Sequence, residues 1–463
     1  MDTIMNKHTE SKPTTVSETR PVPLGAVPFS ASPAGDPGSI RDWANRSVWT
    51  NRMLTTLVTG VRGGKWHALI DKVYTAINLF AAYRKVTGKN GAAGVDHVSC
   101  KEFDRRHRAE LARLESSLRE DTYIPQAILR VNIPKPGSRE KRPLGIPTVR
   151  DRVVQTALLY VIEPIFDHTF HEHSYGFRRQ RGCKNALERV ERLLNEGYVY
   201  VVDADLKSYF DTIDHNILMS LVRAKISDRR ILSLVESYLK QGVLEDLRVW
   251  EPEKGSPQGA VISPLLANIF LNPLDHLLSG EGYEVTRYAD DFVIQCRSAE
   301  EAEAALTLVQ QWTAEVSLTL HPEKTKIVHA HDSEFDFLGY TFRSNKGRIL
   351  RLPRAKSEAK LRESIRRRTR RLRSGSMNAI IADVNKVTKG WFVYFRHSHP
   401  TVFRDYDGWI RRRLRSILRR RRKLPGISKK GKDHQRWTNA YFQAHGYYSL
   451  VTAHASYSQS SQR

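Results

Sequence analysis

Hydrophobic and polar positions alternate with different periods along the 463 residues, and the changes of period divide the chain into parts. Residues 1–42 are rich in Pro, Ser, Thr and Gly and show no period, which predicts a disordered leader. Over 43–118 apolar residues recur at helical spacing. Residues 127–133 then alternate as in a strand and lead into a hairpin punctuated by Pro and Gly, and a long helix is expected over 149–166.

Short apolar runs and helical stretches alternate in the middle of the chain. A β-branched and aromatic run at 199–202 predicts a strand that carries Asp205 at its tip. The other expected elements are a helical stretch over 215–239, a loop from Gly255 that becomes a helix after Pro264, a tight hairpin of strands 283–288 and 292–296, a helix over 300–316 and a strand over 326–330. This order favours an α+β fold in which helices cover an antiparallel sheet.

The last quarter of the chain combines helical periodicity with positive charge. Residues 341–463 hold 32 Lys and Arg against 6 Asp and Glu, whereas the first 340 residues hold 43 against 44, so the net charge of +25 belongs to this quarter. An apolar stripe at helical spacing consists of Trp409, Ile410, Leu414, Ile417 and Leu418. The pattern predicts a packed helix whose basic outer face binds a polyanion, and the alternative is a solubilising tail.

Composition bounds the class of protein. The length suits two to four domains, and 40% hydrophobic residues suffice for sizeable cores. No apolar run approaches 18 residues and no secretory signal begins the chain, so we expect a cytoplasmic protein, in a bacterial cytoplasm or an organelle matrix, without a membrane partner. Cys100, Cys183 and Cys296 are scattered singly, which excludes a disulfide framework and a paired-cysteine zinc site.

Three carboxylates give the strongest chemical signal. Asp290 and Asp291 stand in the sequence YADD between two apolar runs, and Asp205 ends another run 85 residues upstream. Carboxylate oxygens are the ligands that magnesium prefers, and clustered carboxylates repel one another unless a cation neutralises them. Two magnesium ions held there can activate an attacking hydroxyl and stabilise a leaving pyrophosphate. The chemistry that this predicts is nucleotide polymerisation.

Two alternatives to this interpretation follow from the same residues. An Asp-Asp pair is ordinary turn chemistry, although its apolar flanks disfavour a purely solvated turn. Spacing alone also leaves the third ligand open. Asp203 lies on the same face of the predicted strand as Asp205, and Asp211 and Asp214 follow closely.

Several residues are candidates for binding a nucleotide. Lys135 and Arg142 lie on the Pro and Gly punctuated hairpin, where they suit a triphosphate or simply form a basic strand edge. Gln258, in the loop SPQGAVISP, can lie along the minor groove of a nascent base pair, or the loop is only a strand-to-helix turn. Phe210 is either a core aromatic or a side chain that presses on the sugar and excludes a ribose 2′-hydroxyl.

Arginines cluster in two segments of the last quarter, with seven in the twelve residues 362–373 and nine Arg or Lys in the thirteen residues 411–423. Such a run alone is usually a solvated face. Aromatic residues interleave with the basic ones, which favours nucleic acid. The candidate RNA-binding residues are Arg366, Arg367, Arg370, Arg411, Arg412, Arg413 and Arg415.

These segments together resemble the reverse transcriptases of group II introns, the maturase type, from about residue 46 to about residue 450. The motifs that carry the resemblance are GKNGAAGVDHVS, IPKPGSREKRPLGIPTVRDRVVQ, HSYGFRRQRGCKNAL, DADLKSYFDTIDH, GSPQGAVISPLLANIFLNPLD, RYADD, HPEKTKI, FDFLGYTF and TKGWFVYFRHSHP. The resemblance implies a right-hand polymerase with fingers, palm and helical thumb. It implies the domains 1–42 (leader), 43–200 (N-terminal extension and fingers), 201–342 (palm), 343–425 (thumb) and 426–463 (basic C-terminal segment).

The resemblance also implies roles for individual residues. It selects Asp205 over Asp203 as the metal ligand that acts with Asp290 and Asp291. Contacts to the nucleotide are implied for five further residues: Lys135 and Arg142 at the triphosphate, Phe210 at the sugar, Gln258 at the base and Lys324 as a proton donor to pyrophosphate. The hairpin is one residue longer than usual for the family, which makes Lys135 less secure, and Lys326 is a neighbouring alternative to Lys324.

The function implied is that of an RNA-directed DNA polymerase that is also a maturase, a protein that binds its intron RNA and promotes splicing and retrohoming. The implied partners are group II intron RNA, an RNA template, a DNA primer or target and deoxynucleoside triphosphates, with two Mg²⁺ ions and no other small-molecule cofactor. No cysteine pairs follow the thumb segment, so no nuclease activity is expected. The alternatives are a retron-associated or CRISPR-associated reverse transcriptase, or an RNA-binding splicing factor with a vestigial polymerase site.

Overall fold

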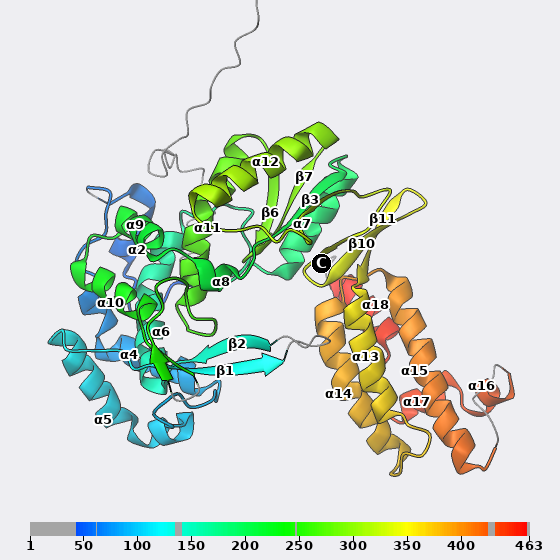
Figure 1. Ribbon diagram of the computed structural model, residues 1–463. Helices are drawn as coiled ribbons and strands as arrows, with labels where there is room; N and C mark the ends of the chain where they lie inside the picture. Colours follow the sequence, from blue (N-terminus) through cyan, green and yellow to red (C-terminus); the bar gives the residue numbers. More distant parts are fainter. Residues whose placement is uncertain (1–42, 62, 135–140, 246–247, 425–430, 461–463) are drawn as a thin grey trace, which may run out of the picture.

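A computed structural model describes residues 43–61, 63–134, 141–245, 248–424 and 431–460. Figure 1 shows a helical N-terminal part, a central sheet covered by helices, and a helical C-terminal part that a small sheet joins to the rest. The leader expected at 1–42 lies outside the described residues. None of the described helices is both long and apolar enough to cross a membrane.

Helices form most of the N-terminal part. They are α2 (Asn51–Thr59), α3 (Ile70–Val73), α4 (Ala76–Thr87), α5 (Cys100–Arg119) and α6 (Val149–Asp167). The α6 helix packs against α3, α4 and α5, and the Thr148 hydroxyl caps its start by accepting from the Asp151 N–H at 3.1 Å. Gly94 lies so close to Thr148 that a Cβ would come within 2.7 Å of that residue's backbone nitrogen. Glycine at this position therefore allows the loop between α4 and α5 to approach the start of α6 closely.

A four-stranded sheet of order β2-β1-β4-β5 lies beside these helices. Its strands are β1 (Ile128–Pro134), β2 (Lys141–Ile146), β4 (Val243–Glu245) and β5 (Arg248–Trp250). The first two strands form the expected antiparallel hairpin, which Figure 1 shows projecting toward the C-terminal part. The tip of this hairpin, with Lys135, lies outside the described residues.

The helical stretch expected at 215–239 is two helices, α9 (His215–Lys225) and α10 (Arg229–Leu239). Asp228 separates them. One of its carboxylate oxygens accepts from the Arg230 and Ile231 N–H groups and caps α10, while the other accepts from the Leu69 and Ile70 N–H groups at the start of α3. The prediction of one continuous stretch missed this break because the apolar spacing continues across it.

The central sheet has the order β6-β7-β3-β8, and all its neighbouring strands are antiparallel. The strands are β3 (Tyr200–Asp205), β6 (Glu284–Tyr288), β7 (Asp291–Cys296) and β8 (Lys326–His329). The helices α7 (Cys183–Asn195), α11 (Ser263–Gly280) and α12 (Ala299–Glu315) pack against it (Figure 1). The antiparallel sheet covered by helices that the sequence predicts is therefore present.

A three-stranded sheet leads from the central sheet into the C-terminal part. It consists of β9 (Phe335–Phe337), β10 (Tyr340–Asn345) and β11 (Arg348–Pro353), and the helices α13 (Ala355–Arg368), α14 (Met377–Phe395) and α15 (Pro400–Arg421) follow. The helices α13, α14 and α15, together with the segments after residue 431, are called the C-terminal bundle below. The predicted apolar stripe is inside it, because Ile410, Leu414 and Ile417 have no exposed surface.

The residues after 431 complete the core of this bundle. They form α16 (Lys432–Arg436), α17 (Asn439–Ala444) and α18 (Leu450–Ser460). Phe442 and Leu450 are fully buried among the side chains of α13, α14 and α15. Asp407 of α15, only 1% exposed, accepts hydrogen bonds from the Tyr447 hydroxyl at 2.8 Å and the Leu450 N–H at 3.1 Å. The segment after 431 thus packs as part of the bundle.

Candidate active site

The YADD sequence forms the tight turn between β6 and β7. Tyr288 and Asp291 pair across the hairpin, so Ala289 and Asp290 make the turn, and Ala289 has a φ of +63°. Asp291 lies opposite Asp205 in the pairing of β7 with β3. The three carboxylates that the sequence singles out therefore lie together where the neighbouring strands β6, β7 and β3 meet at one end of the central sheet.

A buried arginine holds the turn in place. The Arg287 guanidinium has no exposed surface and donates to both carboxylate oxygens of Asp275, at 2.7 and 2.5 Å. It also donates to the Asn268 side-chain oxygen at 2.9 Å and to the Ala289 carbonyl at 2.8 Å. The last bond ties the Ala289 peptide of the turn to a buried, charge-paired guanidinium. Sequence reasoning missed Arg287 since its signal is one arginine in an apolar strand.

Gly176 supports the turn from its other side. The Asn268 amide donates to the Gly176 carbonyl at 2.8 Å, which joins this residue to the Arg287 network. A Cβ on Gly176 would stand 2.2 Å from the Ala289 nitrogen, closer than any nonbonded contact allows. Only glycine therefore permits this approach of the HSYGFRRQRG segment to the YADD hairpin.

Burial and neighbouring carboxylates raise the pKa of Asp290 and of Asp291. Burial raises the pKa of Asp291 to about 7, and the nearby carboxylates of Asp203, Asp290 and Asp205 add to the effect. The pKa of Asp290 is raised by burial and by Asp205, while the positive charges of Arg142 and Arg287 oppose the rise. A site in which ionisation is costly in this way gains most from a bound cation.

The two candidate lysines have different partners. The Lys324 ammonium lies 2.5 Å from an Asp205 carboxylate oxygen. Lys326 instead pairs with Asp203 across β8 and β3, and it opposes the effect of burial, which raises the pKa of Asp203 to about 6. Lys324 is thus the lysine in contact with the predicted ligand set.

The three carboxylates are chemically suited to hard divalent cations, but they do not stand close enough together to surround one. Within the parts of the chain that the structure describes, no three carboxylate, imidazole or thiol groups stand close enough together to hold a metal ion. The candidate metal ligands are nevertheless all carboxylate oxygens. Asp290 and Asp291 have raised pKa values, and Asp205 already binds the Lys324 ammonium. These features fit Mg²⁺ ligation.

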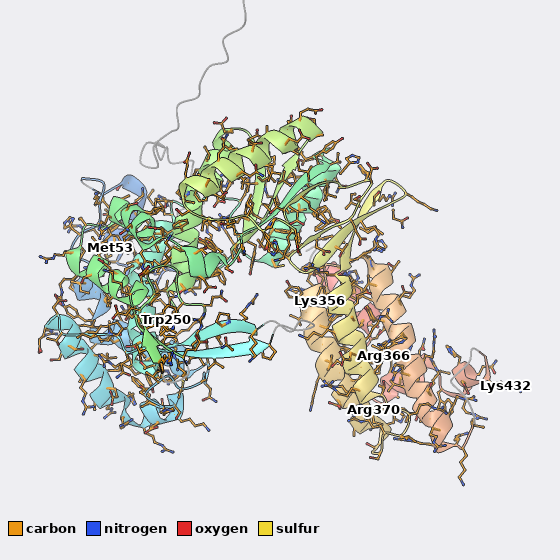
Figure 2. The ribbon with its side chains drawn as sticks, in the orientation of Figure 1. Met53, Trp250, Lys356, Arg366, Arg370 and Lys432 are labelled. Atoms are coloured by element: carbon orange, nitrogen blue, oxygen red, sulfur yellow. The ribbon has the colours of Figure 1, made fainter. Side chains whose placement is uncertain are left out.

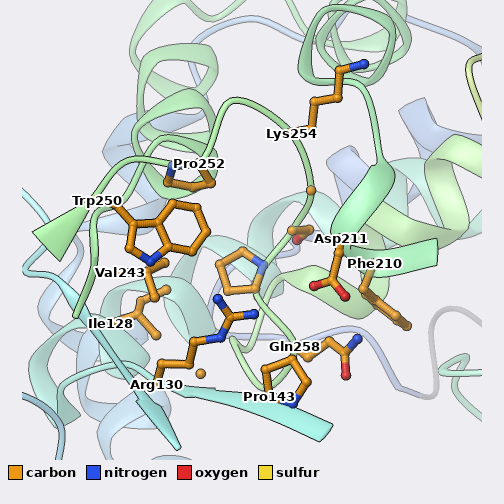
Figure 3. Close-up of a pocket in the computed structure, with 14 residues that line it drawn as sticks. Ile128, Arg130, Pro143, Phe210, Asp211, Val243, Trp250, Pro252, Lys254 and Gln258 are labelled. Carbon is orange, nitrogen blue, oxygen red and sulfur yellow. The ribbon is translucent and has the colours of Figure 1, made fainter. Parts of the chain in front are cut away.

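The four-stranded sheet β2-β1-β4-β5 is called the hairpin sheet below. A cavity of about 120 Å³ lies between this sheet and the loop before α11. Phe210, in the short helix α8 (Tyr209–Thr212), and Gln258 both line it, so the structure brings these two predicted residues together (Figure 3). The loop is held against β2, because the Gly145 N–H donates to the Gln258 carbonyl at 2.6 Å. Arg130 and Trp250 also line the cavity, with the Arg130 guanidinium 5.6 Å from the indole centre, and sequence reasoning did not find them.

Arg142 lies in β2, opposite Ile133. Its charge acts on Asp290, since it lowers the pKa of that carboxyl against the effect of burial. This interaction places a cation of the hairpin sheet within electrostatic reach of the YADD turn.

The C-terminal bundle displays much of the predicted basic surface. Arg366, Arg367 and Arg370 are exposed at the end of α13, where Figure 2 shows Arg366 and Arg370 in order along the bundle. Arg412 is exposed on α15. Arg413 is partly buried and donates to the Thr369 hydroxyl at 2.6 Å, which holds α15 to the end of α13.

Two of the predicted RNA-binding arginines have internal partners. Arg415 is only 2% exposed and donates to the Trp437 carbonyl at 2.8 Å and to the Asn439 side chain at 3.2 Å, so its expected place on an RNA surface is wrong. It holds the segment after 431 against α15. Arg411 is mostly covered and lies 3.6 Å from Asp407. Arg411 and Arg415 are four residues apart, so both lie on the side of α15 that faces the bundle. Because arginines occupy most positions of this segment, the sequence does not show which of them face inward.

The sheet, its carboxylate turn and the cavity beside it are those of a nucleotide-polymerising domain, and comparison with known proteins gives the family. Residues 133–342 match the reverse transcriptase (RNA-dependent DNA polymerase) family, whose members use divalent metal ions and deoxynucleoside triphosphates. Residues 359–437 match the group II intron maturase-specific domain. The chain belongs to the group II intron reverse transcriptases and maturases, as the resemblance predicts.

Curated relatives agree with this family. Protein YkfC of Escherichia coli (strain K12) is 36% identical over 286 residues, which are 53% of this chain and 74% of that protein. The group II intron-encoded protein LtrA of Lactococcus lactis subsp. cremoris is 36% identical over 216 residues, 44% of this chain and 35% of LtrA. The chain thus spans most of one relative and about a third of the other.

A solved structure, a partial Cas6-RT-Cas1–Cas2 complex, contains a chain that is 25% identical with a TM-score of 0.36, covering 54% of this chain and 42% of that chain. The maturase-specific match at 359–437 favours the intron class over the CRISPR-associated alternative.

Proposed function

We propose that this protein copies RNA into DNA at the YADD hairpin and that its C-terminal bundle binds intron RNA. The observation that carries the first role is the pairing of Asp291 with Asp205 beside the Asp290 turn. We infer further that the three structural parts act as the fingers, palm and thumb of a right-hand polymerase. The hairpin sheet belongs to the fingers, the central sheet to the palm and the C-terminal bundle to the thumb.

Asp205, Asp290 and Asp291 are the proposed ligands of two Mg²⁺ ions. Bound there, the ions would supply activation of the primer hydroxyl and neutralisation of the pyrophosphate charge. Asp205 would exchange its bond to the Lys324 ammonium for the metal. Lys324, released but still adjacent, would then be placed to donate a proton to the departing pyrophosphate.

The remaining residues of the site would position the nucleotide. Arg142, whose charge already acts on Asp290, would bind the triphosphate, and Lys135 at the hairpin tip is its proposed companion. Phe210 and Gln258, which share one cavity, would contact the sugar and the base of the incoming deoxynucleotide. Phe210 would exclude a ribose 2′-hydroxyl by occupying its space.

The bundle supplies the second role. Its exposed arginines on α13 and α15 form a surface for RNA phosphates, and the maturase-specific match covers the same helices. The proposed RNA is the group II intron that encodes the protein, and the proposed template and primer are RNA and DNA. Because the carboxylates and these arginines lie on different parts of the fold, polymerisation and splicing should be separable by mutation.

Primer extension on an RNA template tests the polymerase role. Purified protein with Mg²⁺ should make DNA, and Asp290→Ala should reduce the rate by at least about 100-fold because it removes a proposed ligand of both ions. Splicing of the host intron at moderate Mg²⁺ should survive this substitution. No DNA synthesis by the wild type would contradict the polymerase role and favour the splicing factor with a vestigial site. Protein-independent splicing would contradict the maturase role.

A further inference from the structure

A polar cavity of about 370 Å³ lies where the central part meets the C-terminal bundle. It is called the junction pocket below. Its walls come from α7, from β11, from the loop between α14 and α15, and from α18. Neither the carboxylate site nor the exposed arginines of α13 line it, so the proposed functions leave it without a role.

Positive groups from separate walls converge in the junction pocket. Arg351 of β11, Arg396 of the α14–α15 loop and Lys184 of α7 all act on one imidazole, that of His397. Together with burial they lower the pKa of His397 to about 4, and His454 of α18 acts in the same direction. Tyr457 completes the surroundings of the ring, with its hydroxyl 3.4 Å from the His397 Nδ1.

Two carboxylates balance part of this charge. Glu191 lies 2.9 Å from the Arg351 guanidinium, and Glu188 lies 3.5 Å from the Lys184 ammonium. Arg396 has an aromatic neighbour instead, since its guanidinium stands 4.5 Å from the centre of the Tyr457 ring. The excess positive charge of the pocket is therefore centred on Arg396.

Polar atoms of three lining residues are buried without a hydrogen-bond partner. They are the Ser398 hydroxyl, the Arg396 Nε and one terminal nitrogen of Arg351, and Ser398 itself is only 2% exposed. Buried donors in folded proteins almost always have partners. All three atoms belong to residues that line this basic cavity, which points to a ligand that accepts hydrogen bonds and carries negative charge.

We propose that the junction pocket binds a phosphate group of the RNA partner. Arg396 and Arg351 supply charge-assisted donors and Ser398 a neutral one, a set that suits a tetrahedral oxyanion. The bound phosphate would also let His397 take up a proton, because its negative charge offsets the cations that act together with burial to keep the ring neutral. This inference rests on the proposed RNA-binding role and adds a contact at the base of the bundle, where RNA would link it to the central part.

RNA binding by the full-length protein tests the proposal. The probe is a fluorescent RNA hairpin with a single-stranded tail, titrated at several salt concentrations. Arg396→Gln should weaken binding by at least about tenfold and should lower the slope of log K against log salt by roughly 0.7 to 0.9, the value for one lost phosphate contact. Arg108→Gln, at an exposed position of α5 outside the pocket, is the matched control and should retain tighter binding than Arg396→Gln.

Two further variants keep the test independent of folding. Ser398→Ala preserves all charges and should weaken binding by about two- to tenfold without changing the salt slope. His397→Asn should remove the part of the wild-type affinity that grows between pH 7 and pH 5. Melting temperatures of all variants show whether a loss of binding reflects unfolding.

Binding by Arg396→Gln and Ser398→Ala that equals the wild type would overturn the proposal while leaving the RNA-binding role intact. A wild type that binds no RNA would instead overturn that role. The second arm uses inorganic phosphate. Stabilisation of the wild type but not of Arg396→Gln by phosphate, with unchanged RNA affinity, would mean that the pocket takes a free anion, and the assignment to RNA would then be wrong.

Discussion

Arg287 carries a full charge in a place that water does not reach, next to the turn that presents Asp290 and Asp291, the two carboxylates proposed as metal ligands. Its four hydrogen bonds end on three residues from α11 and the turn. The bidentate pair with Asp275 neutralises the charge, whereas the bond to the Ala289 carbonyl orients the turn. Stability and positioning are thus two separable contributions of one side chain.

Substitutions at Arg287 should separate these contributions. Arg287→Met leaves the Asp275 carboxylate buried and unpaired, so the free energy of unfolding should fall by about 3–5 kcal/mol. The double variant Arg287→Met, Asp275→Leu should regain much of that loss but not the rate of primer extension, because the Ala289 carbonyl stays unbound. Urea denaturation and primer extension measure the two quantities. Full activity in the double variant would show that the turn needs no arginine.

The raised pKa of Asp291 should make stability depend on pH and metal. Folded Asp291 holds its proton up to about pH 7, whereas an unfolded aspartate releases it near pH 4. Its contribution to stability is therefore complete below pH 4 and is lost as the pH rises through 7. Without divalent metal, the melting temperature of the wild type relative to Asp291→Asn should fall between pH 5 and pH 8. Added Mg²⁺ should stabilise the wild type more at pH 8 than at pH 6.

Equal pH dependence in Asp291→Asn and the wild type would contradict this assignment. Asp203, whose pKa is raised to about 6, acts in the same direction and remains in both proteins, so the comparison isolates Asp291.

At the scale of elements, the YADD hairpin is fixed by what packs against its turn. The segment that contains Gly176 touches the turn directly, and the helix α11 reaches it through Asn268. The hairpin is therefore a supported element whose position depends on glycine as much as on its own pairing.

Gly176→Ala should disturb this contact. The added Cβ would force the Ala289 peptide to move, which should destabilise the protein by about 1–3 kcal/mol and lower primer extension more than RNA binding. Gly182→Ala is the matched control, because a Cβ there meets nothing within 4 Å. Thermal melting and extension assays compare the two. Similar behaviour of both variants would mean that the close approach has no effect on the site.

Most elements could be predicted from the sequence because their periods are regular, as in α6 and the strands β6 and β7. The boundary between α9 and α10 could not, since it depends on Asp228 bonding to a helix about 160 residues away. The carboxylates were found through their motif. Arg287, Arg130 and Trp250 were not, because their importance comes from neighbours that only the folded chain brings together. Arg415 is the opposite case, a residue predicted to lie on the surface that is buried. Its burial depends on hydrogen-bond partners after residue 431, which the basic run itself does not reveal.

At the scale of the molecule, the positive charge and the carboxylates are separated. The central sheet and the N-terminal helices share one continuous core, whereas the C-terminal bundle has its own. A smaller core that includes Phe335, Phe342 and Phe395 lies between them. Changes in the exposed arginines of α13 should therefore leave the YADD turn intact, and the junction pocket is the place where the two parts can influence each other.

The burial of Leu450 in the bundle has a consequence for the order of events on the ribosome. The last strand of the central sheet, β8, ends at His329, so this sheet can form while translation continues. The bundle cannot close its core until more than 120 further residues have been made and Leu450 has left the exit tunnel. A nascent chain would thus acquire its carboxylate turn before its stable arginine-rich surface, and capture of an intron transcript would wait until Leu450 has been made.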